Sequence, residues 1–289
     1  AMRWRDSRAS QNVEDHRGRP PPRGGGGMGM KFGLGTIILL VIGYFLGIDP
    51  RIVMGLSQVG GELQQPTAQE SVPAGAPVDE MGQFVARVLG ETEDTWSEIF
   101  RAGGQQYPPP RLVLFSQAAQ SACGFASSAS GPFYCPADQK VYIDLAFFRQ
   151  LETEFRAGGD FAMAYVMAHE VGHHVQTVLG VSEKVRATQQ RVGQEQANQL
   201  QVAMELQADC FSGVWAHHAN AKRQVLEPGD IEEAMRAAAA VGDDVIQKRT
   251  QGYVVPESWT HGSAQQRQQW FVRGFESGSL QACDTFQTG

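Results

Sequence analysis

Cysteine is scarce in this chain of 289 residues: it has four, at Cys123, Cys135, Cys210 and Cys283. No two of them have the close spacing, with two to four residues between, that is typical of thiolate zinc sites, so such a site is not expected. An even number in an exported domain suggests two disulfides, for which three connectivities exist. Cys123 and Cys135 flank a loop rich in Ser and Gly and are expected to pair, which leaves Cys210 for Cys283.

Positive charge is also in short supply outside the first residues. Residues 1–31 hold seven Arg and Lys against three Asp and Glu, a balance of +4. Because the whole chain carries −7, the other 258 residues carry −11. A surface of this sign does not suit a phosphate backbone, so we expect no nucleic-acid partner.

Long apolar runs are missing with one exception, residues 32–48, which contain no charged side chain. At ~1.5 Å per residue this run would extend roughly 25 Å as a helix, near the lower limit for crossing a bilayer. It lacks the polar stripe of a buried core helix and the small-residue site of a cleaved signal. We therefore predict one transmembrane helix in a cell membrane, with the N-terminus cytoplasmic and the C-terminal bulk of the chain outside.

This anchor divides the chain into four parts. Residues 1–31 are rich in Gly, Pro and Arg and predict a flexible basic cytoplasmic tail ahead of the anchor. Residues 49–78 have the composition of a linker, and residues 79–289 are expected to form the folded domain. No internal repeat is apparent.

Within the domain, helical patterns outnumber strands. The β-branched runs 111–116 and 140–145 predict two short strands. Asp160 is expected to cap a helix that ends near Leu179, before Gly180. Two more helices are expected in 182–220, and another in 230–246. The predicted fold class is α+β, mostly helical with a small sheet, behind the transmembrane helix.

The stretch MAHEVGHHVQ, residues 167–176, lies inside the predicted helix 160–179. His169 and His173 are four residues apart, so both imidazoles project from one face of that helix and suit a single zinc ion. Glu170 follows the first histidine, where it can reach a metal-bound water, and this is the H-E-x-x-H arrangement. Gly172 leaves room for close packing, while His174 points elsewhere, toward supporting contacts or the surface.

A catalytic zinc needs a third protein ligand, and MELQADC at residues 204–210 offers two carboxylates. Glu205 and Asp209 are four residues apart and share one face of a helix. We expect Glu205 to bind the metal and Asp209 to accept a hydrogen bond from a ligand histidine. The two roles could be reversed. A solvated acidic pair is less natural beside so many apolar neighbours.

Four segments in order, GPFYCPADQKVYIDLAFF, HEVGHHVQ, ELQADCFSGVW and THGSAQQRQQWF, resemble the predicted neutral zinc metallopeptidases of bacteria. The resemblance implies a zincin-like domain with a gluzincin-type site and one Zn²⁺ per chain. Because the family is bacterial, it also implies that the domain is anchored in the bacterial inner membrane and lies in the periplasm. It also implies that His261 donates a hydrogen bond to the oxyanion, with Arg267 as a supporting partner. A surface histidine, or a ligand in place of Glu205, are the other interpretations of His261.

These residues predict a metallopeptidase acting on a peptide or protein substrate. Glu170 would serve as general base and then general acid. For strand 140–144 two interpretations stay open: an edge on which an extended peptide lies, or plain packing in the core. Tyr134 and Tyr142 are candidate pocket residues. Two alternatives remain: an inactive, zinc-stabilised envelope scaffold, and a zinc amidase acting on cell-wall peptides. A scaffold would have no need for Glu170 beside His169.

Overall fold

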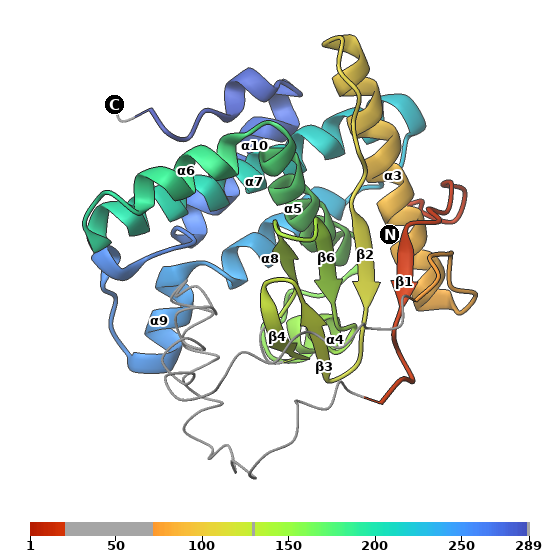
Figure 1. The fold of residues 1–289 in the computed structure, drawn as a ribbon, viewed down its shortest axis with the longest axis horizontal. Helices are drawn as coiled ribbons and strands as arrows, with labels where there is room; N and C mark the ends of the chain where they lie inside the picture. The colour runs from red at the N-terminus through yellow and green to blue at the C-terminus, as the bar shows by residue number, and fades with distance from the viewer. Residues whose placement is uncertain (21–71, 129–130, 288–289) are drawn as a thin grey trace.

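The computed structural model describes residues 1–20, 72–128 and 131–287, and these form a mostly helical body with two small sheets (Figure 1). The larger sheet has the order β1-β2-β6-β5. Its strands are β1 (Val13–Asp15), β2 (Arg111–Leu114), β5 (Phe133–Cys135) and β6 (Lys140–Ile143). The smaller sheet is a hairpin of β3 (Ala118–Ser121) and β4 (Gly124–Ser127).

Side chains of the larger sheet alternate between two apolar clusters. Strands β1, β2 and β6 run parallel, while β5 is antiparallel to β6. Leu112 and Leu114 face the main core among the helices, whereas Val113 faces a smaller cluster with Tyr142 and Ala119. This alternation follows from the two-residue period of a strand and explains how the hairpin covers the far face of the sheet.

Helices make up the rest of the body. They are α3 (Glu80–Ala102), α4 (Ala146–Thr153), α5 (Asp160–Val178), α6 (Val181–Gln189), α7 (Gln194–Arg223), α8 (Asp230–Ala240), α9 (Asp243–Gln251) and α10 (Ala264–Ser277). Two short 3-10 turns, η2 (Pro256–Ser258) and η3 (Leu280–Cys283), complete the described residues. Ser263 caps the N-terminus of α10, and with Gln266 it forms a capping box.

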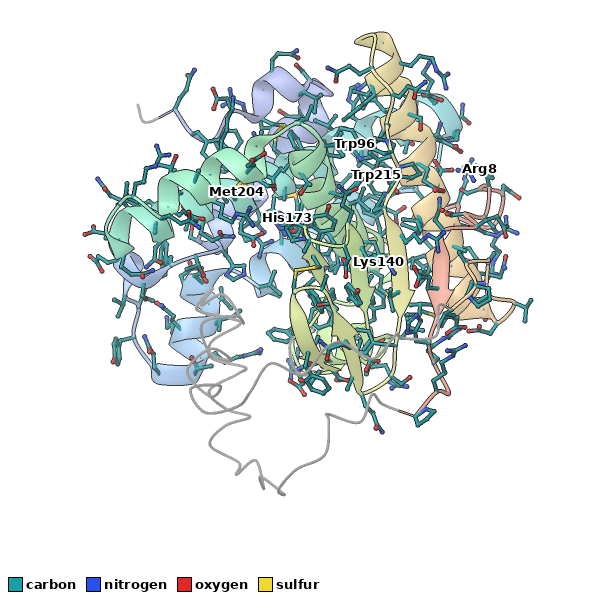
Figure 2. All side chains as sticks on the ribbon, viewed as in Figure 1. Arg8, Trp96, Lys140, His173, Met204 and Trp215 are labelled. Carbon is teal, nitrogen blue, oxygen red and sulfur yellow. A yellow bond between two sulfur atoms is a disulfide. The ribbon has the colours of Figure 1, made fainter. Side chains whose placement is uncertain are left out.

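Large aromatic side chains join the helices in the core. Trp96 of α3 and Trp215 of α7 are fully buried in the interior (Figure 2). Trp96 meets Phe211 of α7 edge-on, with 5.7 Å between ring centroids. Truncating a buried Trp to Ala typically costs about 3–5 kcal/mol, so these contacts fix α7 firmly against α3.

Two glycines let α5 and α10 approach α7 closely. A Cβ placed on Gly172 of α5 would lie 3.1 Å from the carbonyl oxygen of Ala208 in α7. One on Gly274 of α10 would lie only 1.9 Å from the carbonyl oxygen of Cys210. Any larger residue would push the helices apart. Close packing at these points brings the histidines of α5, the carboxylates of α7 and the polar residues of α10 together.

Both predicted disulfides are confirmed. Cys123 is bonded to Cys135 and joins the β3–β4 turn to the end of β5. Cys210 is bonded to Cys283 and ties η3 to the middle of α7, across 73 residues of sequence. The second bridge therefore holds the C-terminal segment against the helix that carries Glu205 and Asp209.

The predicted fold class needs correction at the N-terminus. The predicted anchor, residues 32–48, lies outside the described residues, and so does most of the predicted linker. Within the parts of the chain that the structure describes, no helix is long and apolar enough to cross a membrane. The described residues support a mostly helical fold with small sheets, and not the predicted fold with a transmembrane helix in front.

The predicted single-pass location is also wrong, for a reason of topology. Strand β1, from the predicted cytoplasmic tail, pairs with β2 of the domain, and Trp4 packs in the core. One membrane crossing between residues 20 and 72 would separate these two strands. The basic composition misled the prediction because several arginines are paired with acidic groups of the domain. For example, Arg8 contacts Asp94 at 3.0 Å, and Arg17 contacts Asp79 at 2.7 Å.

Two local predictions differ as well. Strand 140–144 does not form an edge, because β6 lies between β2 and β5 in the sheet. The predicted helix 230–246 is two helices, α8 and α9, separated at Val241–Gly242. Gly242 lets the start of α10 approach closely, because a Cβ there would lie 2.4 Å from the backbone nitrogen of Ala264.

Candidate metal centre

Helices α5 and α7 bring three ligand side chains to one point. The Nε2 atoms of His169 and His173 each lie 2.8 Å from Oε2 of Glu205. One donor atom from each residue lies within 4.8 Å of those of the other two, and both His169 and Glu205 are buried. The predicted ligand set is therefore assembled by the fold, with Glu205 in the place expected of the third ligand.

The hydrogen bonds of the two histidines decide which nitrogen faces the centre. Nδ1 of His169 donates to Oδ1 of Asp209 at 2.9 Å, and Nδ1 of His173 donates to Oε1 of Gln176 at 2.8 Å. In the neutral rings, both Nε2 atoms then carry lone pairs. Two lone pairs and a carboxylate oxygen within hydrogen-bond distance repel one another unless positive charge, from a proton or a metal ion, lies between them. These residues fit a divalent metal, and imidazole with carboxylate suits zinc.

The charges of the same groups favour a positive charge at this point. Burial alone would lower the pKa of His169, but Asp209 and Glu205 raise it to about 10. Burial would likewise raise the pKa of Glu205, yet His173 and His169 hold it well below its usual range. The centre is thus built to hold a cation next to Glu205.

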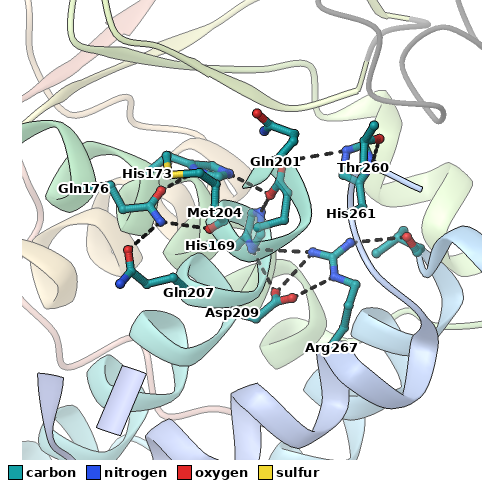
Figure 3. A network of polar contacts seen from close by, with 12 residues as sticks. His169, His173, Gln176, Gln201, Met204, Gln207, Asp209, Thr260, His261 and Arg267 are labelled. Carbon is teal, nitrogen blue, oxygen red and sulfur yellow. Dashed lines mark hydrogen bonds and ion pairs between the residues drawn. The ribbon is translucent and has the colours of Figure 1, made fainter. Parts of the chain in front are cut away.

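Asp209 lies between His169 and Arg267 (Figure 3). Its Oδ2 accepts a hydrogen bond from Nε of Arg267 at 2.7 Å, and its Oδ1 accepts one from Nη2 at 3.1 Å. The hydroxyl of Tyr165 also donates to Oδ1. All three side chains are buried. Asp209 thus orients His169, as expected. The resemblance implied that Arg267 supports His261, but its hydrogen bonds go to Asp209 instead.

A chain of amides supports His173 instead. Gln176, which accepts from His173, donates to the carbonyl oxygen of Met204 at 2.8 Å and to Oε1 of Gln207 at 2.9 Å. Gln207 in turn donates to the carbonyl oxygen of Cys283 at 3.0 Å. Sequence reasoning missed both glutamines. Their spacing from the ligands was the available signal, since Gln176 is three residues after His173 and Gln207 two after Glu205.

Glu170 lines the pocket next to the three candidate ligands, and no described residue forms a hydrogen bond with its carboxylate. Burial raises the pKa of its carboxyl, and the positive charge of His169 opposes this shift only in part. A buried carboxylate with a raised pKa and no partner is suited to taking a proton from a water molecule.

His261 comes from the segment before α10 and also reaches the centre. Its Nε2 lies 3.7 Å from Oε1 of Glu205, on the oxygen that the two ligand histidines do not contact. Asp243 holds its backbone: Oδ2 accepts hydrogen bonds from the N–H groups of Thr260, His261 and Gly262 at 2.7–2.9 Å. Asp243 was missed by sequence reasoning, because nothing near it in sequence points to the metal.

His174 has a different position from its two neighbours. It is fully buried, and its Nε2 donates to the carbonyl oxygen of Pro108 at 2.7 Å while Nδ1 accepts from Tyr134 at 2.8 Å. Burial lowers the pKa of this imidazole. His174 is therefore a neutral core residue that fixes α5 to the segment before β2, and the surface interpretation is wrong.

A pocket of about 370 Å³ opens over the centre. Its lining includes the three candidate metal ligands together with Glu170 and His261. One wall comes from β4, β5 and α4 and is mainly apolar; it includes Phe125, Phe133, Tyr134 and Phe147. The opposite wall comes from α6 and the start of α7. Of the two predicted pocket tyrosines, Tyr134 lines it and Tyr142 does not.

Comparison with known proteins agrees with this centre. The chain belongs to the family described as "Putative neutral zinc metallopeptidase", whose model matches residues 2–286. It is 47% identical to the uncharacterized protein YpfJ of Escherichia coli K12 over 291 aligned residues, covering 99% of each chain. The uncharacterized protein Rv2575 of Mycobacterium tuberculosis H37Rv is 42% identical over 258 residues, 83% of this chain and 84% of that protein. No solved structure matches.

Proposed function

We propose that this protein is a zinc-dependent peptidase that hydrolyses peptide bonds with an activated water molecule. The observation that carries the proposal is the meeting of His169, His173 and Glu205 in a pocket, beside the carboxylate of Glu170, which accepts no hydrogen bond from any described residue. A purely structural metal site needs neither the free carboxylate nor the opening.

Each residue has a distinct part in the reaction. His169, His173 and Glu205 would hold the zinc ion, which when bound polarises the scissile carbonyl and lowers the pKa of water to about 7. Glu170 takes the proton of the attacking water on its carboxylate and passes it to the leaving amine. His261 donates a hydrogen bond from Nε2 to the oxyanion that develops on the former carbonyl oxygen.

Replacement of Glu170 by Gln tests the general base directly. The Glu170→Gln variant should keep zinc at the wild-type stoichiometry, because Glu170 is not a ligand. Cleavage of a diverse peptide library, with cell-wall peptides included, should fall by about 10²–10⁴-fold. Zinc content is measured by mass spectrometry of the metal, and products by peptide mass spectrometry. Equal zinc in both proteins with no cleavage by the wild type would favour the scaffold interpretation. Cleavage restricted to cell-wall peptides would favour the amidase interpretation.

Replacement of His261 separates catalysis from metal binding. His261→Phe should retain zinc and substrate affinity, with kcat reduced by roughly 10²–10³-fold for the loss of one oxyanion donor. Near-normal turnover would return His261 to a structural role. Loss of zinc from this variant would make it a ligand.

A further inference from the structure

The two walls of the pocket differ in chemistry. The wall from β4, β5 and α4 presents aromatic side chains, whereas α6 presents Ser182, Val185, Arg186 and Gln189. Relative to Ser182, the other three lie three, four and seven residues further on, so the four positions form one face of the helix turned toward the pocket. Peptide bound between the walls would therefore meet apolar surface on one side and polar groups on the other.

Arg186 stands out on this polar face. It is exposed, and the described part of the structure gives its guanidinium no hydrogen bond and no ion pair. The other arginine that lines the pocket, Arg267, is buried and fully engaged with Asp209. The carboxylates that line the pocket are Glu170 and Glu205, both at the metal centre. Among the described residues, Arg186 thus has no acidic partner, and both carboxylates that line the pocket lie at the candidate metal centre.

A second donor is linked to the face of α6 that carries Arg186, because Gln189, three residues after Arg186, contacts Gln201 of α7. Gln201 lines the pocket on α7, one helical turn before Glu205. Its Oε1 accepts a hydrogen bond from Nε2 of Gln189 at 3.3 Å, which fixes the amide so that its NH₂ group is the free end. Among the described residues this NH₂ group has no acceptor. Figure 3 shows Gln201 on the same side of the centre as His261.

We propose that Arg186 is a specificity-determining residue that, with Gln201, binds a carboxylate of the peptide substrate. This inference rests on the proposed peptidase function and names its substrate class: peptides with a carboxylate close to the scissile bond and an apolar side chain for the opposite wall. An Arg guanidinium binds a carboxylate through two parallel hydrogen bonds, which a neutral amide cannot reproduce. The carboxylate is supplied by an Asp or Glu side chain or by the C-terminus of the peptide.

Matched peptides distinguish these sources. In one series, both ends are blocked and a single Glu is moved from three residues before to three residues after the scissile bond, each with a Gln counterpart. In a second series, a neutral peptide carries either a free or an amidated C-terminus. Wild-type protein should prefer the carboxylate in one position by about tenfold in kcat/KM, mainly through KM.

Charge reversal gives the decisive comparison. Arg186→Glu should abolish the preference for Glu and favour a Lys at the same position, while Arg186→Gln should only abolish it. Lys184→Glu is the matched control, since Lys184 is exposed on the same helix but does not line the pocket. It should behave as wild type. A preference unchanged in Arg186→Glu, or equal rates for Glu and Gln peptides at every position, would overturn the proposal.

Binding keeps this test separate from that of the peptidase function. The zinc-loaded Glu170→Gln variant should bind the fluorescently labelled Glu peptide about tenfold more tightly than the Gln peptide, measured by anisotropy, and Arg186→Glu added to it should remove the difference. Equal affinities would overturn the inference about Arg186. Absence of any cleavage by wild-type protein would instead count against the proposed peptidase function alone.

Discussion

His169 and His173, the two proposed ligand histidines, are four residues apart on one helix, yet they are held by different kinds of partner. His169 is held by a charged arm, defined here as Asp209, Arg267 and Tyr165. His173 is held by an amide arm, defined as Gln176, Gln207 and the carbonyl of Cys283. Both arms fix the same tautomer, so the geometry at the metal can be the same while the energetics differ.

The difference lies in what happens when an arm is broken. In the charged arm, burial would raise the pKa of Asp209, but Arg267 and His169 hold it below its usual range. Removing one member leaves a buried charge without its partner, which typically costs about 3–5 kcal/mol. In the amide arm the groups are neutral, and a lost hydrogen bond costs about 1–3 kcal/mol. The charged arm should therefore dominate both folding and metal affinity.

Removal of a metal ligand should cause the largest loss of zinc affinity. Glu205→Ala deletes the oxygen that both histidines face, so zinc affinity should fall by more than 100-fold, beyond the range for supporting residues. Competition with a chromogenic chelator measures the dissociation constant. If Asp209→Ala were the variant isolated without metal while Glu205→Ala retained it, the roles of the two carboxylates would be exchanged.

Breaking the charged arm should have the next largest effect. Asp209→Ala removes the partner of His169 and leaves the buried charge of Arg267 without its carboxylate. Zinc affinity should therefore fall by about 10–100-fold. The free energy of unfolding of the metal-free protein should fall by about 3–5 kcal/mol, measured by denaturant titration.

A double variant separates the two consequences. Adding Arg267→Met to Asp209→Ala removes the stranded charge, so part of the lost stability should return while zinc affinity stays low. Stability that fell further in the double variant would show that Arg267 acts independently of Asp209.

The charged arm was also the more visible of the two in the sequence. Asp209 follows Glu205 by one helical turn, and that spacing alone predicts a shared face, as the HExxH spacing does for His169 and His173. The amide arm depends on Cys283, which is far away in sequence, and on two glutamines whose spacing from the ligands is only a weak signal, because it does not show that the two side chains contact each other. The fold of residues 1–20 was missed for a similar reason, because β1 is stabilised by β2 and not by its own composition.

The amide arm should give a smaller effect than the charged arm. Gln176→Ala leaves Nδ1 of His173 without its acceptor but leaves no charge behind. We expect about a tenfold loss of zinc affinity, at the lower end of the range for supporting residues. Gln189→Ala is a suitable control, because Gln189 lines the same pocket but contacts neither histidine. A loss as large as that of Asp209→Ala would mean that the charge of an arm is unimportant.

The smallest effect on zinc should come from the far end of the amide arm. Replacing both Cys210 and Cys283 by Ser frees the C-terminal segment, but three hydrogen bonds in succession separate its carbonyl from the metal ligand. Zinc affinity should therefore change by less than about threefold, less than for any supporting residue that contacts a ligand. Stability should fall much more, on the order of 4 kcal/mol for a closed loop of 73 residues.

The other disulfide provides the matched control. Replacing both Cys123 and Cys135 by Ser opens a loop of only 12 residues, and the same model gives about 3 kcal/mol. Both double variants are compared by denaturant titration and by zinc competition under conditions where they stay folded. If freeing Cys283 lowered zinc affinity as much as Gln176→Ala, the amide arm would depend on its covalent anchor, and its last hydrogen bond would matter as much as its first.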